Sequence, residues 1–456
     1  MKRSLALLLC LVVTAALLAG CSAGRVELSA ADPVTLTMWH VYGSQTESPL
    51  NTLIDQFNRT EGKDRGVAVS VVSVNNSTDI DAALIASAAG DPGSVALPDL
   101  FTAYPRVAEK IGTQRLLDWS RYLTEEETQA YLADFLREGQ WDDELLMLPI
   151  AKSTELCFVN RTLFDRFAEA VGTGADVYDL TDFDRLFSLC SQYCDWSGGG
   201  TLFQINDFYH YFLVNVSSLG GEFIVDGRPD FDSEAFRRVW TPMAQAGIHG
   251  GLCVQDGYAS DRWKTAEVLS NIGSSAGILY LRDYVTYPDN TTEDIETLIL
   301  PYPTFQGASP TVMQRGTGLF ALRSEDERRN KAAAVFAKWI TQGSHNVEFA
   351  TRTGYMPVTQ EGYENLMHNV GAVENDKYRM LYGAVGDMYG SYRFLSLPRY
   401  EGAADVQSAL DRSVKQVLSD AHAEYLSRVQ AGEAATPVTE ELADRAFEEL
   451  ERLMAQ

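Results

Sequence analysis

Strand-like and helix-like segments alternate from residue 34 onward, and this order constrains the fold more than any other feature of the chain. Residues 34–39 are rich in β-branched side chains and partly alternate between polar and apolar, which predicts a strand. Residues 48–60 repeat apolar side chains at helical spacing, and residues 67–72, 80–89 and 98–101 continue as strand, helix and short strand. A β-α-β-α-β order forms a parallel sheet with helices on both faces. The sequence therefore predicts an α/β fold.

The length of the chain and the absence of a linker bear on how its domains are arranged. At about 150 residues per domain, a chain of 456 residues has room for roughly three domains or two large ones. Amphipathic helices are also predicted over residues 332–340 and 406–418. Because no low-complexity linker separates these segments, we expect two lobes that are wound together rather than strung in series.

The first 20 residues have the pattern of a secretory signal peptide. Lys2 and Arg3 precede an apolar run over residues 5–18, which is shorter than the roughly 18 apolar residues of a membrane span. An uncleaved anchor is the alternative. The run ends in Leu-Ala-Gly-Cys, which resembles a bacterial lipobox. This resemblance implies cleavage after residue 20, a lipid on Cys21 and a tether over residues 21–33.

The charge of the chain bears on its partners. It has 37 Lys and Arg against 63 Asp and Glu, which gives a formal net charge of −26. A field of this sign repels phosphate backbones and anionic lipid headgroups. We therefore expect no nucleic acid partner, whereas the net charge does not exclude a neutral ligand.

The cysteines predict neither a disulfide scaffold nor a metal centre. Beyond Cys10 and Cys21, the chain has Cys157, Cys190, Cys194 and Cys253. Their pairing cannot be read from sequence, and no CxxC or HExxH motif occurs. We expect no metal and no cofactor.

Several segments, in this order, resemble the extracellular solute-binding proteins of bacterial ABC importers, in the sugar-binding family that includes maltose-binding protein. The matching segments are residues 36–40 with 53–58, 148–150 with 156–164, 219–223 with 226–229, and 336–341 with 353–358. The resemblance implies two α/β lobes joined by a hinge, with the ligand in the cleft between them. A general rule agrees, because open α/β sheets bind ligands beyond the carboxyl ends of their strands.

The resemblance also implies where the chain crosses between the lobes. The crossings are expected near residues 152–155, 313–316 and 355–357. Lobe one is then formed by residues 34–152 plus 316–355, and lobe two by residues 153–315 plus 356–456.

A neutral sugar needs apolar ring faces to stack on and planar polar groups to bracket its hydroxyls. Candidate residues of both types follow the predicted strands or lie at the crossings. They are Trp39, His40, Asn76, Asp99, Tyr104, Glu155, Trp196, Asp207, Tyr209, Ser274, Arg315 and Tyr355. For each aromatic residue the alternative is core packing, and for each polar residue it is a cap or a turn.

One hypothesis pairs two of these aromatic residues. Residues 196–212 are dense in aromatic side chains, and Phe208 and Phe212 are spaced for one helix face. Tyr209 then points away from that face, and its polar tip suits a wet cleft wall. We expect Tyr209 and Trp39, from opposite lobes, to stack on a sugar ring.

Two enzyme classes are alternatives to the binding function. Residues 273–277 match the G-x-S-x-G nucleophile elbow, and residues 249–251 resemble an esterase oxyanion loop. The two segments are too close in sequence for the structure that separates them in esterases. A glycosidase needs two carboxylates at a set separation, which the abundant acidic residues cannot establish. We therefore expect no enzyme activity.

The function implied is that of a monomeric, lipid-anchored receptor on the outer face of the bacterial membrane. It would capture a carbohydrate and deliver it to an ABC permease, with the ligand favouring closure of the hinge. Three alternatives remain: the same scaffold with glycerol phosphate, a peptide or a polyamine; a sensory ligand-binding protein; and a secreted hydrolase.

Overall fold

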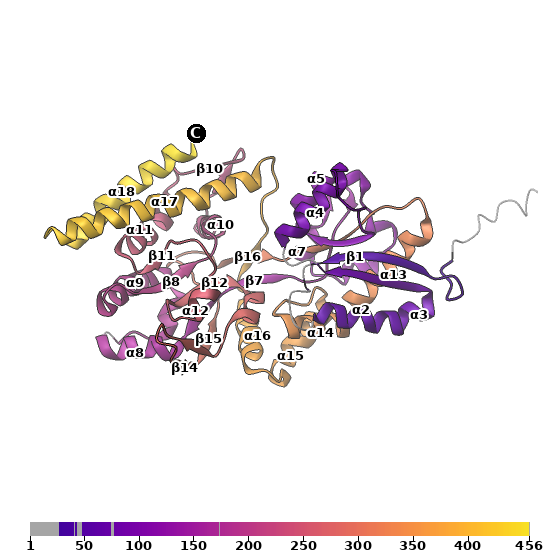
Figure 1. Ribbon diagram of the computed structural model, residues 1–456, viewed down its shortest axis with the longest axis horizontal. Coiled ribbons are helices and arrows are strands. Elements are labelled where there is room, and N and C mark those ends of the chain that lie inside the picture. The colour runs from indigo at the N-terminus through magenta and orange to yellow at the C-terminus, as the bar shows by residue number, and fades with distance from the viewer. Residues whose placement is uncertain (1–26, 41, 43–47, 74–76, 173, 456) are drawn as a thin grey trace, which may run out of the picture.

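A computed structural model describes residues 27–40, 42, 48–73, 77–172 and 174–455. The predictions made for the signal peptide, Cys21 and Asn76 lie outside these residues. The described residues form two α/β lobes side by side, each built around its own sheet (Figure 1).

Lobe one contains a five-stranded sheet in the order β2-β1-β3-β17-β6. Strand β1 pairs in parallel with β2 and β3, whereas β17 is antiparallel to both β3 and β6. The elements of this lobe are the strands β1 (Val34–His40), β2 (Val67–Ser73), β3 (Leu100–Ala103), β6 (Leu148–Pro149) and β17 (Gly318–Ala321), the hairpin β4 (Gln140–Trp141) and β5 (Glu144–Leu145), the helices α2 (Pro49–Arg59), α3 (Glu61–Arg65), α4 (Ser77–Ala89), α5 (Pro105–Ile111), α6 (Glu125–Gln129), α7 (Ala133–Arg137), α13 (Glu327–Thr341) and α14 (Gly343–Thr353), and the short turns η1 (Thr113–Arg115) and η2 (Trp119–Arg121).

Helix α2 illustrates how the sequence builds this lobe. The Ser48 hydroxyl accepts a hydrogen bond from the Asn51 amide, and Pro49 occupies the first turn, so the helix start is capped. Its apolar stripe is buried, and the Phe57 ring lies 5.2 Å from that of Phe336 in α13. Each such fully buried side chain contributes roughly 1.5–3 kcal/mol to stability. Burial of one face against the sheet therefore holds α2 in place.

Helices cover both faces of the first sheet. Helices α2 and α13 cover one face, onto which Leu36 and Met38 of β1 point, and α4 and α5 cover the other. Trp39 points onto this second face, where it is packed in an apolar cluster with Ile80 and Phe101. Successive side chains of a strand point to opposite faces, and at the end of β1 the side chains on both faces are buried, whereas Thr35 and Thr37 are exposed.

Lobe two contains a seven-stranded sheet in the order β11-β8-β12-β7-β16-β18, with β15 also paired to β7. Its elements are the strands β7 (Ser153–Asn160), β8 (Thr201–Ile205), β11 (Leu252–Cys253), β12 (Val268–Ser274), β15 (Thr297–Leu300), β16 (Thr311–Arg315) and β18 (Arg393–Leu395), the hairpins β9 (Ile224–Val225) with β10 (Arg228–Pro229) and β13 (Tyr284–Thr286) with β14 (Thr292–Asp294), the helices α8 (Arg161–Val171), α9 (Phe183–Ser197), α10 (Phe208–Ser218), α11 (Glu234–His249), α12 (Ala259–Trp263), α16 (Asp376–Met388), α17 (Ala403–Gln430) and α18 (Ala435–Met454), and the short turns η3 (Val177–Thr181) and η4 (Ser275–Tyr280).

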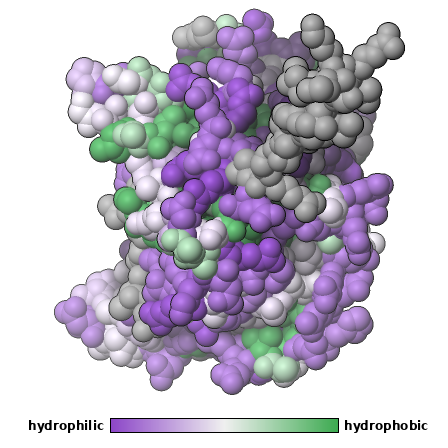
Figure 2. All heavy atoms as spheres, turned by 90° about the vertical axis from the view of Figure 1, so that its right-hand side faces the viewer, coloured by the Kyte–Doolittle hydropathy of each residue, from purple (hydrophilic) through white to green (hydrophobic). Residues whose placement is uncertain are grey.

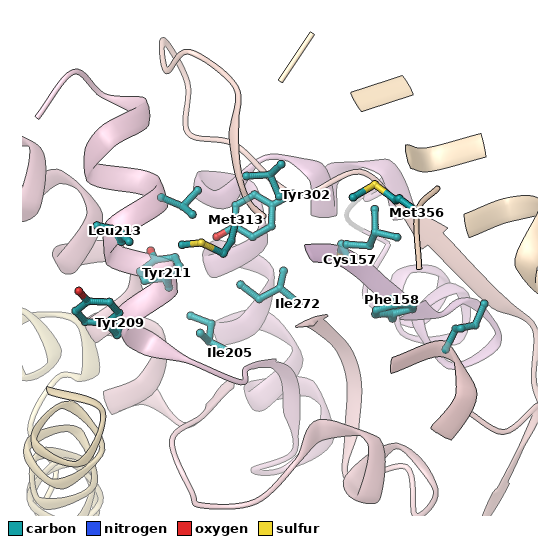
Figure 3. Close-up of a cluster of buried hydrophobic side chains, with 14 of the residues drawn as sticks. Cys157, Phe158, Ile205, Tyr209, Tyr211, Leu213, Ile272, Tyr302, Met313 and Met356 are labelled. Carbon is teal, nitrogen blue, oxygen red and sulfur yellow. The ribbon is translucent and has the colours of Figure 1, made fainter. Parts of the chain in front are cut away.

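The core of lobe two is centred on β7 and α10. All eight residues of β7 are buried, since three strands pair with it and helices cover it. Figure 3 shows Phe158 of β7 and Ile272 of β12 in the same cluster as Tyr211 of α10. Tyr209 lies at the outer edge of that cluster (Figure 3).

The chain passes between the two sheets at β6–β7 and again at β16–β17. Gly316 lies at the second passage with φ +106°, and a Cβ there would come within 2.5 Å of the Ala151 carbonyl oxygen, so a glycine is required. A third segment of the chain passes through this region after α14. There the Met356 amide donates a hydrogen bond of 2.6 Å to the Lys152 carbonyl. Three passages packed against one another form the hinge region.

The segment after this third passage stays beside lobe one before the chain reaches lobe two. The Leu132 amide donates to the Val358 carbonyl at 2.9 Å, and the Gln360 amide donates to the Ala130 carbonyl at 2.9 Å. Helix α15 (Gln360–His368) and the turn η5 (Val370–Ala372) follow, and α16 then packs on β15 of lobe two. The predicted boundary between residues 355 and 356 stays a prediction.

The surface of lobe one that faces away from lobe two is mostly hydrophilic (Figure 2). Apolar side chains reach this face only in small, separate patches. Across the described part of the chain, no helix combines the length and apolarity that a membrane span requires.

Candidate ligand-binding cleft

A cavity of about 740 Å³ lies between the two lobes, within the size range of small-molecule sites. Residues that follow the carboxyl ends of strands in both sheets line it, as the general rule for open α/β sheets requires. From lobe one come Tyr42, Tyr104, Thr317, Thr353 and Tyr355, and from lobe two come Ser153, Asn206, Asp207, Tyr258, Asp261, Lys264, Asn271, Ser274, Tyr280 and Arg315, among others. We call this cavity the cleft.

Tyrosines dominate the apolar surface of the cleft. The Tyr42 hydroxyl and the Thr317 Oγ1 are hydrogen-bonded at 2.8 Å, and the Tyr355 ring meets the Tyr42 ring edge-on at 5.5 Å. Both rings of lobe one are therefore held rigidly. On lobe two, Tyr258 and Tyr280 are 73% and 52% exposed, so their ring faces are free to contact a solute.

A buried ionic cluster forms the floor of the cleft. Arg315 Nη1 donates to Glu155 Oε1 at 2.9 Å, and His210 Nδ1 lies 3.4 Å from the same oxygen. His210 Nδ1 is also 3.5 Å from Asp207 Oδ2, which accepts a hydrogen bond from Gln407 Nε2 at 2.9 Å. The arginine is thus already paired with a carboxylate of the protein.

Electrostatics favour the ionised forms of Asp207 and Arg315 in this cluster. Burial alone would raise the pKa of Asp207, but the His210 and Arg315 charges outweigh it and lower that pKa below its usual range. Burial would likewise lower the pKa of Arg315, and the Glu155 carboxylate outweighs it, so that pKa is raised. The lowered pKa of Asp207 and the raised pKa of Arg315 therefore both favour an ion pair across the cluster.

The second cation of the lining is paired as well. Lys264 Nζ donates to Asp261 Oδ1 at 2.8 Å at the mouth of the cleft. Among the described lining residues, both cationic side chains consequently have a carboxylate partner within the protein.

Amide side chains complete the wall contributed by lobe two. Asn206 Nδ2 donates to the Ile272 carbonyl at 3.1 Å, and its Oδ1 accepts from the Ala259 amide at 3.0 Å, which fixes the start of α12. Asn271 is buried beside it, and its Oδ1 has no hydrogen-bond partner among the described residues. Such an oxygen is a candidate acceptor for a donor that the protein itself does not provide.

The structure brings five of the residues predicted from sequence to the cleft. These are Tyr104, Asp207, Ser274, Arg315 and Tyr355. Glu155 lies directly behind the lining, where it holds Arg315. Tyr209 instead lines a second, smaller cavity between the lobes.

Four residues that were predicted to line the cleft lie elsewhere in the structure. Trp39 is buried in the core between the first sheet and α4, so it cannot stack with Tyr209 on a sugar ring. His40 is buried and contacts Asn51 Oδ1 at 2.8 Å. Asp99 accepts hydrogen bonds from the Thr37 amide and from Arg329, and Trp196 packs on Phe167 at the surface of α9.

The placement of Trp39 has a simple cause. Both faces of the first sheet are covered by helices. The last residues of β1 are therefore buried whichever face of the sheet their side chains point to. The residue that reaches the cleft from this strand is Tyr42, two positions after β1 ends.

Several lining residues were missed from sequence, namely Tyr42, Asn206, Tyr258, Asn271 and Tyr280. Asn206 directly follows a strand and belongs to a run with Asp207, so its position offered a signal. Asn271 lies inside β12, and no local pattern separates it from a strand residue of the core.

The G-x-S-x-G segment does not form a nucleophile elbow. Ser275 is buried at the start of η4, and its hydroxyl accepts a hydrogen bond from the Thr154 amide at 3.4 Å. His249 ends α11, where it contacts Asp195 and Tyr425. The serine and this histidine therefore have different neighbours and do not form a catalytic pair.

A family model matches residues 52–372, and its description is bacterial extracellular solute-binding protein. No curated protein sequence matches the chain significantly. The match covers more than half of the chain and includes residues of both lobes.

Solved structures of similar fold span nearly the whole chain. The cyclic alpha-maltosyl-1,6-maltose binding protein from Arthrobacter globiformis has a TM-score of 0.65 at 18% identity, covering 92% of this chain and 99% of that chain. The GacH receptor of Streptomyces glaucescens, solved unliganded and with acarbose, has a TM-score of 0.62 at 16% identity, with coverages of 92% and 98%. UgpB from Mycobacterium tuberculosis in complex with glycerophosphocholine has a TM-score of 0.63 at 16% identity, with coverages of 92% and 99%.

Proposed function

Because this chain belongs to the bacterial extracellular solute-binding protein family, we propose that it captures a neutral carbohydrate in the cleft and delivers it to an ABC permease. The proposal places the protein outside the cytoplasm, held at the membrane by a lipid on Cys21. It acts as a monomer and binds its solute without chemical change.

The lining of the cleft is the observation that carries this proposal. Tyrosine rings supply flat apolar faces, and amide and hydroxyl groups between them supply hydrogen bonds, which together match a sugar ring. The cationic side chains Arg315 and Lys264 are both engaged with carboxylates of the protein. An anionic solute would have to displace one of these carboxylates from its cation, which costs free energy that a neutral solute does not require.

Binding would be coupled to closure of the hinge. Tyr42 and Tyr355 belong to one side of the cleft, and Asn271 and Tyr280 to the other. A solute that contacts both sides stabilises the closed arrangement, so its addition shifts the population towards closure. A permease could then recognise the closed pair of lobes.

A choline-containing glycerophosphodiester is the second candidate. Tyrosine faces bind quaternary ammonium groups, and the cleft has five tyrosines. One protein of similar fold was solved with glycerophosphocholine. Its phosphate would need a free cation, however, and the described lining offers two that are already paired.

Calorimetry with representatives of each class tests the proposal. We expect maltotriose, isomaltotriose, cellotriose or another neutral oligosaccharide of a panel to bind, and glycerophosphocholine and spermidine to fail. Saturation at about 100 times Kd should stabilise the protein by about 2.7 kcal/mol. Tyr355→Ala should weaken binding, whereas Tyr178→Ala, an exposed tyrosine on η3, should not. Binding of glycerophosphocholine alone would favour the second candidate.

A further inference from the structure

A buried carboxylate of lobe one contacts the chain passages of the hinge. The Glu138 side chain directly follows α7 and is 9% exposed. Its Oε2 accepts a hydrogen bond from Lys152 Nζ in the first passage and another, at 3.1 Å, from Gln314 Nε2 just before the second passage. Both donor residues are buried. One carboxylate oxygen thus joins lobe one to two of the three passages.

Lys152 extends these contacts to the remaining passage. Its Nζ lies 3.5 Å from the Gly316 carbonyl oxygen in the second passage. Its own carbonyl oxygen accepts the hydrogen bond from the Met356 amide in the third passage. Glu138 and Lys152 together therefore contact all three passages of the hinge.

Backbone contacts fix the position of Glu138 on lobe one. The carbonyl of the next residue, Gly139, accepts hydrogen bonds from the Leu146 and Met147 amides at 2.9 and 3.2 Å. A Cβ at Gly139 would lie 1.9 Å from the Met147 carbonyl oxygen, so the two segments are in direct contact. Met147 leads into β6 and the first passage. The carboxylate is therefore carried by a tightly packed part of lobe one.

Gln314 indicates that these contacts fix a position more than they add stability. Its side chain is buried, its Nε2 donates to Glu138, and its Oε1 has no hydrogen-bond partner among the described residues. A buried oxygen without a donor costs free energy, so an apolar side chain of similar size would stabilise the fold at least as well. A buried ion pair can likewise be replaced by two apolar side chains without loss of stability.

Strand β16 connects these contacts to the cleft. Its last two residues are Gln314 and Arg315, and successive side chains of a strand point to opposite faces. Gln314 contacts Glu138, whereas Arg315 lines the cleft and contacts Glu155. The place at which Gln314 is held therefore also sets where Arg315 lies on the floor of the cleft.

From these contacts we infer that Glu138 is a positioning residue of the hinge. Together with Lys152 and Gln314 it holds the three passages in one register, and it thereby restricts how the two lobes move against each other. The inference goes beyond the proposed function and holds whichever solute the cleft binds.

Hydrogen exchange of the ligand-free protein, followed by mass spectrometry, tests the inference. The double variant Glu138→Leu with Lys152→Met removes the ion pair without leaving a buried charge, and Gln314→Leu removes only the hydrogen bond from β16. In both variants we expect peptides covering residues 311–317 and 352–358 to exchange about tenfold faster, because local opening of the hinge becomes easier. Peptides from α11 and β1 should exchange as in the wild-type protein, because the apolar replacements preserve global stability.

A matched control and two contrary outcomes complete the test. Glu144→Leu replaces an exposed glutamate of the β4–β5 hairpin and should leave all of these exchange rates unchanged. Unchanged exchange in the hinge peptides overturns the inference. An equal rise in the hinge peptides, α11 and β1 also overturns it, because the contacts would then serve global stability alone. Gln314→Leu decides if the two variants differ or if the double variant does not fold.

Discussion

At the scale of single residues, His40 makes stability sensitive to acid. Its imidazole is completely buried; the Tyr42 amide donates to Nδ1 at 3.1 Å, and Nε2 faces Asn51 Oδ1 at 2.8 Å. An accepting Nδ1 and a donating Nε2 describe a neutral ring. Burial lowers the pKa of His40 from 6.5 to about 4, although the Asn51 contact opposes this.

The pH dependence of unfolding tests this placement. The unfolded state binds more protons than the folded state between pH 6.5 and about pH 4, so the His40 contribution is complete above pH 6.5 and is lost as the pH falls towards 4. The free energy of unfolding should drop by roughly 3 kcal/mol over this interval from His40 alone. In the His40→Gln variant, urea unfolding measured across this pH range should no longer show this loss in the free energy of unfolding. The control variant His368→Gln, which replaces an exposed histidine, should still show this loss.

Arg315 should stabilise the protein through the carboxylates it neutralises. Arg315→Ala leaves Glu155 and Asp207 close to each other in buried surroundings. Loss of one partner from a buried pair costs about 3–5 kcal/mol, and we expect about 2 kcal/mol here because Arg315 is 25% exposed.

Urea unfolding at pH 7 measures this loss. The pKa of Asp207 is lowered in the folded protein, so its stabilising contribution is present above its unfolded pKa and disappears as the pH falls through its folded pKa. Without Arg315, acid unfolding should begin at a higher pH. The charge-balanced pair Glu155→Gln with Arg315→Met should recover part of the stability, and a double variant no better than Arg315→Ala would contradict this account.

At the scale of elements, the connection between β18 and α17 ties the two lobes together. Arg399 of this connection contacts Gln140 and Trp141 in the β4–β5 hairpin of lobe one. Phe394 of β18 meets Phe135 of α7 edge-on, with ring centres 6.4 Å apart. The contact therefore crosses from lobe two to lobe one.

Removal of this contact should favour the open arrangement. In Arg399→Ala we expect a larger radius of gyration without ligand in small-angle scattering. We also expect weaker ligand binding, because closure itself becomes less favourable by about 1 kcal/mol. Arg228→Ala, an exposed arginine on β10, provides the control. An unchanged radius and unchanged affinity would show that the connection does not hold the lobes.

At the scale of the whole molecule, anchoring and capture are expected to be separable. Cys21 and the first 20 residues lie outside the described residues, and the described lining of the cleft begins at Tyr42. Cys21→Ala should release the protein from membranes into the soluble fraction, as judged by fractionation. Its ligand affinity should stay unchanged. Retention at the membrane would instead support an uncleaved anchor.

Local patterns in the sequence were sufficient for the architecture. The alternation of periods 2 and 3.6 predicted β1, α2, β2 and α4, because the two periods arise from backbone geometry. The family followed from several short segments in a consistent order. The candidate residues at strand ends and crossings included Tyr104, Arg315 and Tyr355, since sheet topology places such positions at the cleft.

Only the tertiary structure decided which aromatic side chains reach the cleft. Trp39 closes a strand and resembles a binding residue in sequence, yet a second layer of helices buries it. Tyr209 shares its helix with core residues, and its environment depends on Tyr400, which is distant in sequence. Burial and pairing arise from elements that meet in space after folding. The sequence by itself thus determined two α/β lobes and a binding function, whereas the identity of the cleft wall was set by packing between segments far apart in the chain.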